Sequence, residues 1–95
     1  MAAFIIADVT VKDPDTYAEY RKQVPATVAK YGGRFLVRGG AYEPLEGDWR
    51  PGRFVVIEFP DTAAAKAWYN SQEYSPLVKL RQTASTGHVI LVEGA

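Results

Sequence analysis

The feature that most constrains the fold of this chain is the order of its apolar segments. Four short runs rich in β-branched and aromatic residues, each typical of a strand, cover residues 3–11, 34–40, 53–59 and 86–93. Segments with helical spacing of apolar residues follow the first run and the third. This order predicts an α+β, ferredoxin-like βαββαβ fold. We expect one four-stranded antiparallel sheet with strand order 4-1-3-2 and the helices on one face.

Capping residues mark where the helices begin. Asp13, followed by a proline, predicts a helix start because its carboxylate can accept hydrogen bonds from unpaired amides. The same kind of signal occurs at residues 60–61 and again at residues 75–76, where Ser-Pro predicts a serine cap. Pro25 lies within the first helical stripe, so we expect a kink or break near Gln23.

Both faces of the predicted sheet are apolar. Alternation along the strands predicts that one set packs on the helices: Ile5, Ala7, Val9, Val11, Val55, Ile57 and Phe59. The opposite face also carries large apolar residues: Phe4, Ile6, Leu36, Phe54 and Val56. In the second strand, Arg34 and Arg38 are expected on this second face. A monomer would expose a large apolar patch, so we expect a homodimer through the sheet face, a dimeric α/β barrel.

Composition narrows the classes of function. The 95 residues suit a single domain over residues 1–95. Lysine plus arginine equals aspartate plus glutamate, 11 against 11, which argues against nucleic acid or an anionic membrane as partner. The chain has no cysteine, no apolar run long enough to span a membrane and no signal-peptide pattern, so we expect a cytoplasmic protein.

Three residues are candidates for proton transfer. His88 is the only histidine, and a nearby carboxylate such as Asp8 could fix its tautomer and raise its pKa. We take the first and third strands to run parallel, which would place Asp8 and Glu58 at the same end. The alternative is that His88 is a structural strand-end residue satisfied by a hydrogen bond. One histidine cannot make a typical metal site, so no metal and no cofactor are expected.

A second candidate site is built around Arg38. The guanidinium could bind a carboxylate in a bidentate manner, and the two glycines that follow would let a ligand approach the backbone. Alternatively, Arg38 pairs with one of three glutamates, Glu43, Glu46 or Glu58, and the glycines form a bulge.

Aromatic residues could complete that site. Tyr17, Tyr20 and Trp68 fall on predicted helices, where they either fill the core or line a cleft. Trp49, in the loop of residues 42–52, is expected to act as a dimer clamp or lid. RNA-recognition domains share this topology, but Val55 and Val56 stand where their third strand needs a small residue and an aromatic, and Glu58 would repel phosphate.

Several motifs resemble one bacterial protein family. They cover the segments 31–40, 45–49, 56–60, 67–71 and 73–74, together with Arg81 and residues 92–94. In this order they are similar to the family known as domain of unknown function 1330. The resemblance implies a dimeric α/β barrel but no activity. The wider superfamily includes cofactor-independent monooxygenases, muconolactone-type isomerases and haem enzymes, whose catalytic residues match no motif in this sequence.

Two hypotheses follow for function. In the first, a cytoplasmic homodimer binds a small anionic or aromatic metabolite, with Arg38 holding the anion and the three helix aromatics closing over it. His88, Glu58 or Asp8 could then move a proton in a cofactor-independent isomerisation, decarboxylation or oxygenation. In the second, the dimer is a non-catalytic ligand-sensing or scaffold module.

Overall fold

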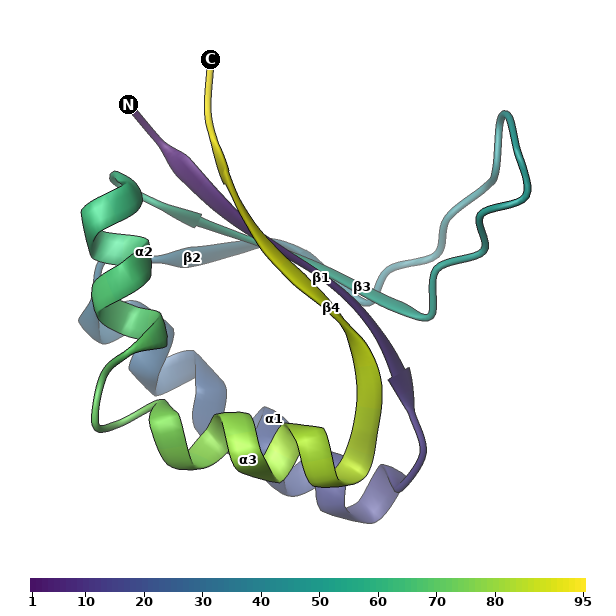
Figure 1. Cartoon of the computed structure of the whole chain (residues 1–95), viewed down its shortest axis with the longest axis horizontal. Coiled ribbons are helices and arrows are strands. Elements are labelled where there is room, and N and C mark those ends of the chain that lie inside the picture. The colour runs from purple at the N-terminus through teal and green to yellow at the C-terminus, as the bar shows by residue number, and fades with distance from the viewer.

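The computed structural model describes all 95 residues and has two layers, a sheet and a set of helices (Figure 1). The Cα atoms extend over 34 × 33 × 16 Å, so the molecule is one sheet and one helix layer thick. The elements in chain order are β1 (Ala3–Val11), α1 (Pro14–Lys30), β2 (Arg34–Arg38), β3 (Arg53–Phe59), α2 (Thr62–Tyr69), α3 (Ser75–Ala84) and β4 (Ser85–Glu93). No helix has the length and apolar character that a membrane crossing requires.

The sheet has the predicted strand order, β2-β3-β1-β4, and the ferredoxin-like fold is confirmed. All three neighbouring pairs are antiparallel. The expectation that the first and third strands run parallel is therefore wrong. The crossover through α1 makes β1 and β2 parallel, and β3 is inserted between them in the opposite direction. Asp8 lies opposite Phe54, whereas Glu58 lies opposite Phe4, so the two carboxylates are at opposite ends.

The predicted division of the sheet into two apolar faces is confirmed by burial and register. Ile5, Val9 and Ile57 are buried beneath the helices. On the other face, which we call the outer face, Ile6 lies between Val56 on β3 and Ile90 on β4. The same register pairs Asp8 with His88, which settles that His88 is on the outer face.

A β-bulge changes the faces of strand β2. Phe35 pairs with Ile57, but Val37 then pairs with Val56 and Arg38 with Val55. The extra residue at the bulge reverses the alternation after it. Arg38 consequently lies on the helix face of the sheet, not on the outer face as the sequence alternation predicts.

The helix boundaries follow the predicted caps with two exceptions. Asp13 caps α1 by accepting from the amide of Thr16, and Asp61 caps α2. Helix α1 continues through Pro25 without the expected break, because the flanking Val24 and Val28 are buried against the core. Helix α3 begins at Ser75 itself, whose hydroxyl donates to a backbone carbonyl of the preceding turn.

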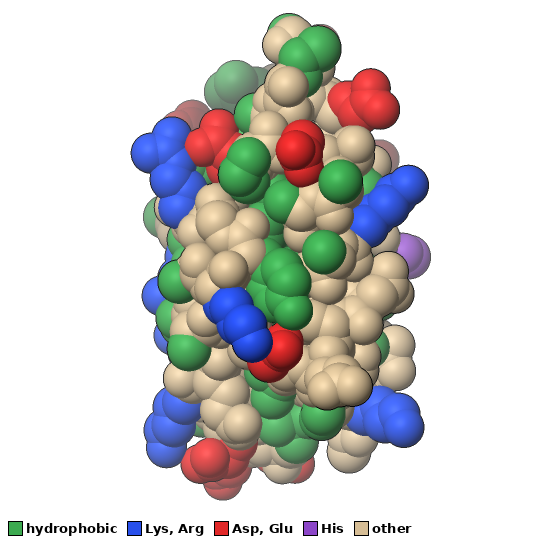
Figure 2. Space-filling model, turned by 90° about the vertical axis from the view of Figure 1, so that its left-hand side faces the viewer, with side chains coloured by type: hydrophobic (Ala, Val, Ile, Leu, Met, Phe, Trp, Pro, Cys, Tyr) green, Lys and Arg blue, Asp and Glu red, His purple; other side chains and the backbone are tan.

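The core lies between the sheet and the helices and is centred on Trp68. The indole stacks on the ring of Tyr74, with 4.0 Å between centroids, and contacts Phe59 at 5.4 Å. Its Nε1 donates to the hydroxyl of Thr27 at 3.0 Å. Figure 2 shows the side of the molecule on which α2 lies, where hydrophobic side chains follow the middle of the face and charged ones are scattered around them.

Candidate functional site

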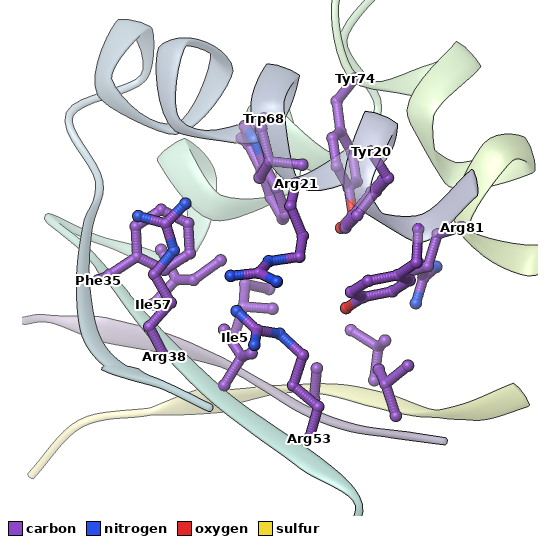
Figure 3. Close-up of a pocket in the computed structure, with 16 residues that line it drawn as sticks. Ile5, Tyr20, Arg21, Phe35, Arg38, Arg53, Ile57, Trp68, Tyr74 and Arg81 are labelled. Atoms are coloured by element: carbon purple, nitrogen blue, oxygen red, sulfur yellow. The ribbon is translucent and has the colours of Figure 1, made fainter. Parts of the chain in front are cut away.

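A cavity opens between the helices and the helix face of the sheet. Its enclosed space is small, about 40 Å³, within a hollow of about 520 Å³ that includes the open space at its mouth. Apolar side chains of β1, β3 and β4 form its floor, and residues of α1, α2 and α3 form its roof (Figure 3). The lining comprises Ile5, Ala7, Val9, Tyr17, Tyr20, Arg21, Val24, Phe35, Arg38, Arg53, Val55, Ile57, Trp68, Tyr74, Arg81 and Val89.

Four of the six arginines of the chain line this cavity, and no aspartate, glutamate or histidine does. Figure 3 shows the guanidinium groups of Arg21, from α1, and Arg53, from β3, converging at the centre. Arg38 lies to one side of them and Arg81 to the other. The three ion pairs of the structure, Lys22–Glu19, Lys30–Glu73 and Arg34–Glu58, include none of the four. The neutral chain thus carries a concentrated positive charge in its cavity.

Local structure explains how each arginine reaches the cavity. Arg53 has the same strand parity as Val55 and Ile57, which are on the helix face. Arg21 lies one helical turn after the buried Tyr17, and Arg81 one turn after the buried Leu77. Arg38 turns inward because of the bulge in β2.

The structure separates the two explanations offered for Arg38. Its guanidinium carbon lies 4.4 Å from the centroid of the Phe35 ring, a cation–π contact, and it pairs with no glutamate. Glu58 binds Arg34 instead, with 2.7 Å between Nε and Oε1. Gly39 adopts a positive φ of 70°, and its Cα packs so closely on the Arg53 guanidinium that a side chain there would displace it.

The three aromatic residues predicted for the site all line the cavity and also belong to the core. Tyr17 and Tyr20 lie on α1 with 5.3 Å between ring centroids, and Trp68 lines the same cavity from α2. The two alternatives for these residues, core packing and cleft lining, are therefore both realised. The structure brings Arg38 together with all three.

The three predicted proton-transfer residues lie elsewhere. Asp8 and His88 are neighbours on the outer face and border a shallow hollow with Trp49. Both carboxylate oxygens of Asp8 are bound by the loop: Oδ2 accepts from Trp49 Nε1 at 3.0 Å and Oδ1 from the amide of Gly52 at 2.8 Å. Glu58 is at the far end of the sheet. Their catalytic role stays a prediction, and the cavity contains none of them.

Sequence reasoning did not assign Arg21, Arg53 and Arg81 to the site, although a signal was present for each. Arg53 occupies a position whose alternation points to the helix face, and Arg81 falls on the buried stripe of α3. Arg21 is exposed but follows the buried Tyr17 by one helical turn on α1. A charged residue at such a position is unusual in a core and indicates either a partner or a ligand. No cluster of three metal-ligating side chains is present.

Sequence comparison identifies the family. The profile of the family described as domain of unknown function (DUF1330) matches residues 2–95. The chain belongs to the DUF1330 family. No curated protein matches it significantly in sequence.

Solved structures share the fold of this DUF1330 protein at low sequence identity. RPA0582 from Rhodopseudomonas palustris, a protein of unknown function, is 20% identical, with a TM-score of 0.80 over 99% of this chain and 82% of that chain. A dimeric ferredoxin-like protein of unknown function from Jannaschia sp. CCS1 is 11% identical, with a TM-score of 0.74 over 99% and 100%. SnoaB, a cofactor-independent oxygenase from Streptomyces nogalater, is 18% identical, with a TM-score of 0.64 over 99% and 92%.

Two buried tyrosines of the DUF1330 chain form a hydrogen-bonded pair at the cavity. The hydroxyls of Tyr20 and Tyr74 are 2.7 Å apart. Burial, more than any nearby charge, raises the pKa of both phenols above its ordinary value. Both side chains are therefore neutral hydrogen-bond donors at neutral pH.

This burial predicts loss of stability in alkali. In the unfolded chain a tyrosine ionises near pH 10, whereas the folded state holds the proton more tightly. The stabilisation is thus complete below about pH 10 and is lost as the pH rises further, by up to about 1.4 kcal/mol per pH unit for each group.

Urea unfolding at a series of pH values should show that the free energy of unfolding declines less steeply in alkali in Tyr20→Phe than in wild type. Tyr42→Phe, at a position 48% exposed, is the control and should keep the wild-type slope. If the free energy of unfolding declined equally steeply with pH in all three proteins, the raised pKa of Tyr20 would be contradicted.

Proposed function

We propose that this protein is a homodimer that binds a small organic anion in the cavity between its helices and its sheet. The observation that carries the proposal is the set of four arginines in a cavity without an acidic residue. Unpaired guanidinium groups that converge repel one another, and an anion between them removes that repulsion. The aromatic and aliphatic lining favours a ligand with a flat apolar body.

The anion should contact Arg53 and Arg38. Arg38 is exposed and Arg53 is half-buried, so both remain accessible to a ligand that enters from solvent. Arg21 faces Arg53 across the cavity, which allows two guanidinium groups to share one carboxylate (Figure 3).

Direct titration with benzoate tests the proposal, with neutral benzamide as the matched probe. We expect benzoate to bind at least tenfold more tightly than benzamide, and Arg38→Ala and Arg53→Ala each to reduce benzoate affinity about tenfold, the effect of one charge-assisted contact. Arg50→Ala, which removes an exposed arginine outside the cavity, should leave benzoate affinity unchanged. Native mass spectrometry of the purified protein would identify a natural ligand. The proposal would be contradicted if benzoate and benzamide bound with equal affinity, or if both cavity variants dissociated and unfolded. Either result would favour a scaffold role for the protein.

The outer face supports the homodimer. Large apolar side chains remain exposed there, including Leu36 at 47% and Ile90 at 54%. Trp49 extends this patch by packing edge-on against Phe54 at 5.8 Å, which suits the expected clamp. A second copy related by a two-fold axis would cover the patch with an identical surface. The Jannaschia protein of similar fold is dimeric.

Ligand binding without catalysis is the function that the cavity supports best. Proton transfer in an isomerase or decarboxylase needs a group that titrates near neutral pH, whereas the lining holds no carboxylate or imidazole, and burial raises the pKa of Tyr20 and Tyr74 above its ordinary value. Oxygenation of a ligand that is itself acidic is the second candidate, because a set of cations and phenols can stabilise an enolate. Oxygen consumption with an added ligand would favour that second candidate over a sensing role.

A further inference from the structure

One end of the cavity holds a buried cation without a partner. Arg81, on α3, is only 7% exposed and takes part in no ion pair. Its Nε is completely buried and donates no hydrogen bond. A buried, unpaired charge is among the most costly arrangements in a protein interior, so a group that accepts from it would stabilise the site strongly.

The tyrosine pair beside Arg81 has a spare donor as well. Two hydroxyl groups, Tyr20 and Tyr74, share one hydrogen bond, so one of the two protons remains without an acceptor. All three side chains line the cavity, and Figure 3 shows Tyr20, Tyr74 and Arg81 on the same side of it. This end of the cavity therefore offers two unused donors and a positive charge.

Arg81 lies apart from the other arginines, on the opposite side of the central Arg21 and Arg53 from Arg38 (Figure 3). Arg38 and Arg53 come from β2 and β3 on one side, and Arg81 comes from α3, which packs on β4 at the other edge of the sheet. The side chains of Ile5, Ala7 and Val9 on β1 lie in the floor between them. Neighbouring strands are about 4.8 Å apart and β1 lies between β3 and β4, so Arg53 and Arg81 come from positions separated by roughly the length of a benzene ring with a substituent at each end.

We propose that Arg81, Tyr20 and Tyr74 form a second subsite for an anionic oxygen, so that the ligand is a bifunctional organic acid. Its first carboxylate binds at Arg21, Arg38 and Arg53, its apolar body lies over β1, and its second acidic group accepts from Arg81 and the tyrosine pair. This inference rests on the proposed function and specifies the class of ligand.

Matched pairs of acids test the second subsite. Terephthalate carries two carboxylates and benzoate one; adipate and hexanoate are the flexible equivalents. We expect at least one diacid to bind tenfold or more tightly than its monoacid, the effect of a hydrogen bond to a charged group. The compound 4-hydroxybenzoate, titrated below and above the pKa of its phenol, shows whether an ionised phenol serves as the second group.

Variants assign that preference to Arg81. Arg81→Met keeps the apolar stem and removes the buried charge, so the diacid should lose at least tenfold in affinity and fall to about that of the monoacid, while the monoacid, which contacts the other three arginines, should weaken much less. Tyr20→Phe, which removes one hydroxyl, should reduce the preference about three- to tenfold and serves equally if Arg81→Met folds poorly. In Arg53→Ala, monoacids and diacids should weaken together.

The outcomes separate the two proposals. If no acid binds, or Arg53→Ala has no effect, the proposed function itself fails. If monoacids bind through Arg53 but neither diacid binds more tightly, the second subsite fails alone, and ordered water satisfies Arg81. A loss of monoacid affinity in Arg81→Met that equals the loss of diacid affinity would also overturn the second subsite.

Discussion

Replacement of Trp68 by alanine should lower the free energy of unfolding by about 3–5 kcal/mol, the cost of truncating a buried tryptophan. Trp68 is 2% exposed and holds three parts of the molecule together: Tyr74 from α3's cap, Phe59 from β3 and Thr27 from α1. A domain of this size is stabilised by only about 5–15 kcal/mol. Urea unfolding at one fixed protein concentration measures the change.

Trp49→Ala is the matched control, because the same residue type is 62% exposed there. It loses one hydrogen bond to Asp8 and an edge contact with Phe54, so its effect on unfolding of the single subunit should be about 1 kcal/mol or less. The two variants are compared in a chain that also carries Ile90→Asp, because Trp49 is expected at the dimer interface. Trp68→Phe should recover part of the stability by filling most of the space. Similar losses in Trp68→Ala and Trp49→Ala would show that the core is not centred on Trp68.

Replacement of Ile90 by aspartate should abolish the dimer. Ile90, on β4, belongs to the exposed apolar patch and lies directly opposite Ile6 on β1. In a dimer its side chain would be buried, and an unpaired carboxylate at that position loses its hydration. A cost of only about 3 kcal/mol already weakens association more than 100-fold. Sedimentation velocity at several loadings should show a wild-type dimer and a monomeric variant.

Gln72→Asp adds the same charge at an exposed position between α2 and α3 and should remain dimeric. Circular dichroism of Ile90→Asp should retain the spectrum of a folded α+β protein, since this side chain is exposed in the single subunit. A wild-type chain that sediments as one subunit at every concentration, or an unchanged mass for Ile90→Asp, would contradict the proposed interface.

The order of elements and most of their ends could be predicted from the sequence. The strand and helix periodicities, the caps at Asp13 and Asp61, and the glycine that ends α1 with φ 79° depend on residues close together in the chain. The apolar character of both sheet faces could also be predicted from local sequence, because alternation along β1 and β3 fixes which side chains share a face. Local physics therefore determined the fold and the expectation of a partner for the outer face.

The site was decided by the tertiary structure. Strand direction separated Glu58 from Asp8, and a single bulge in β2 moved Arg38 from the outer face into the cavity. Four arginines that are up to 60 residues apart in the sequence meet only because α1, β2, β3 and α3 pack around one space. Alternation along one segment cannot specify which distant residues line the same cavity, since register, bulges and helix packing are set by contacts between segments that are distant in the chain.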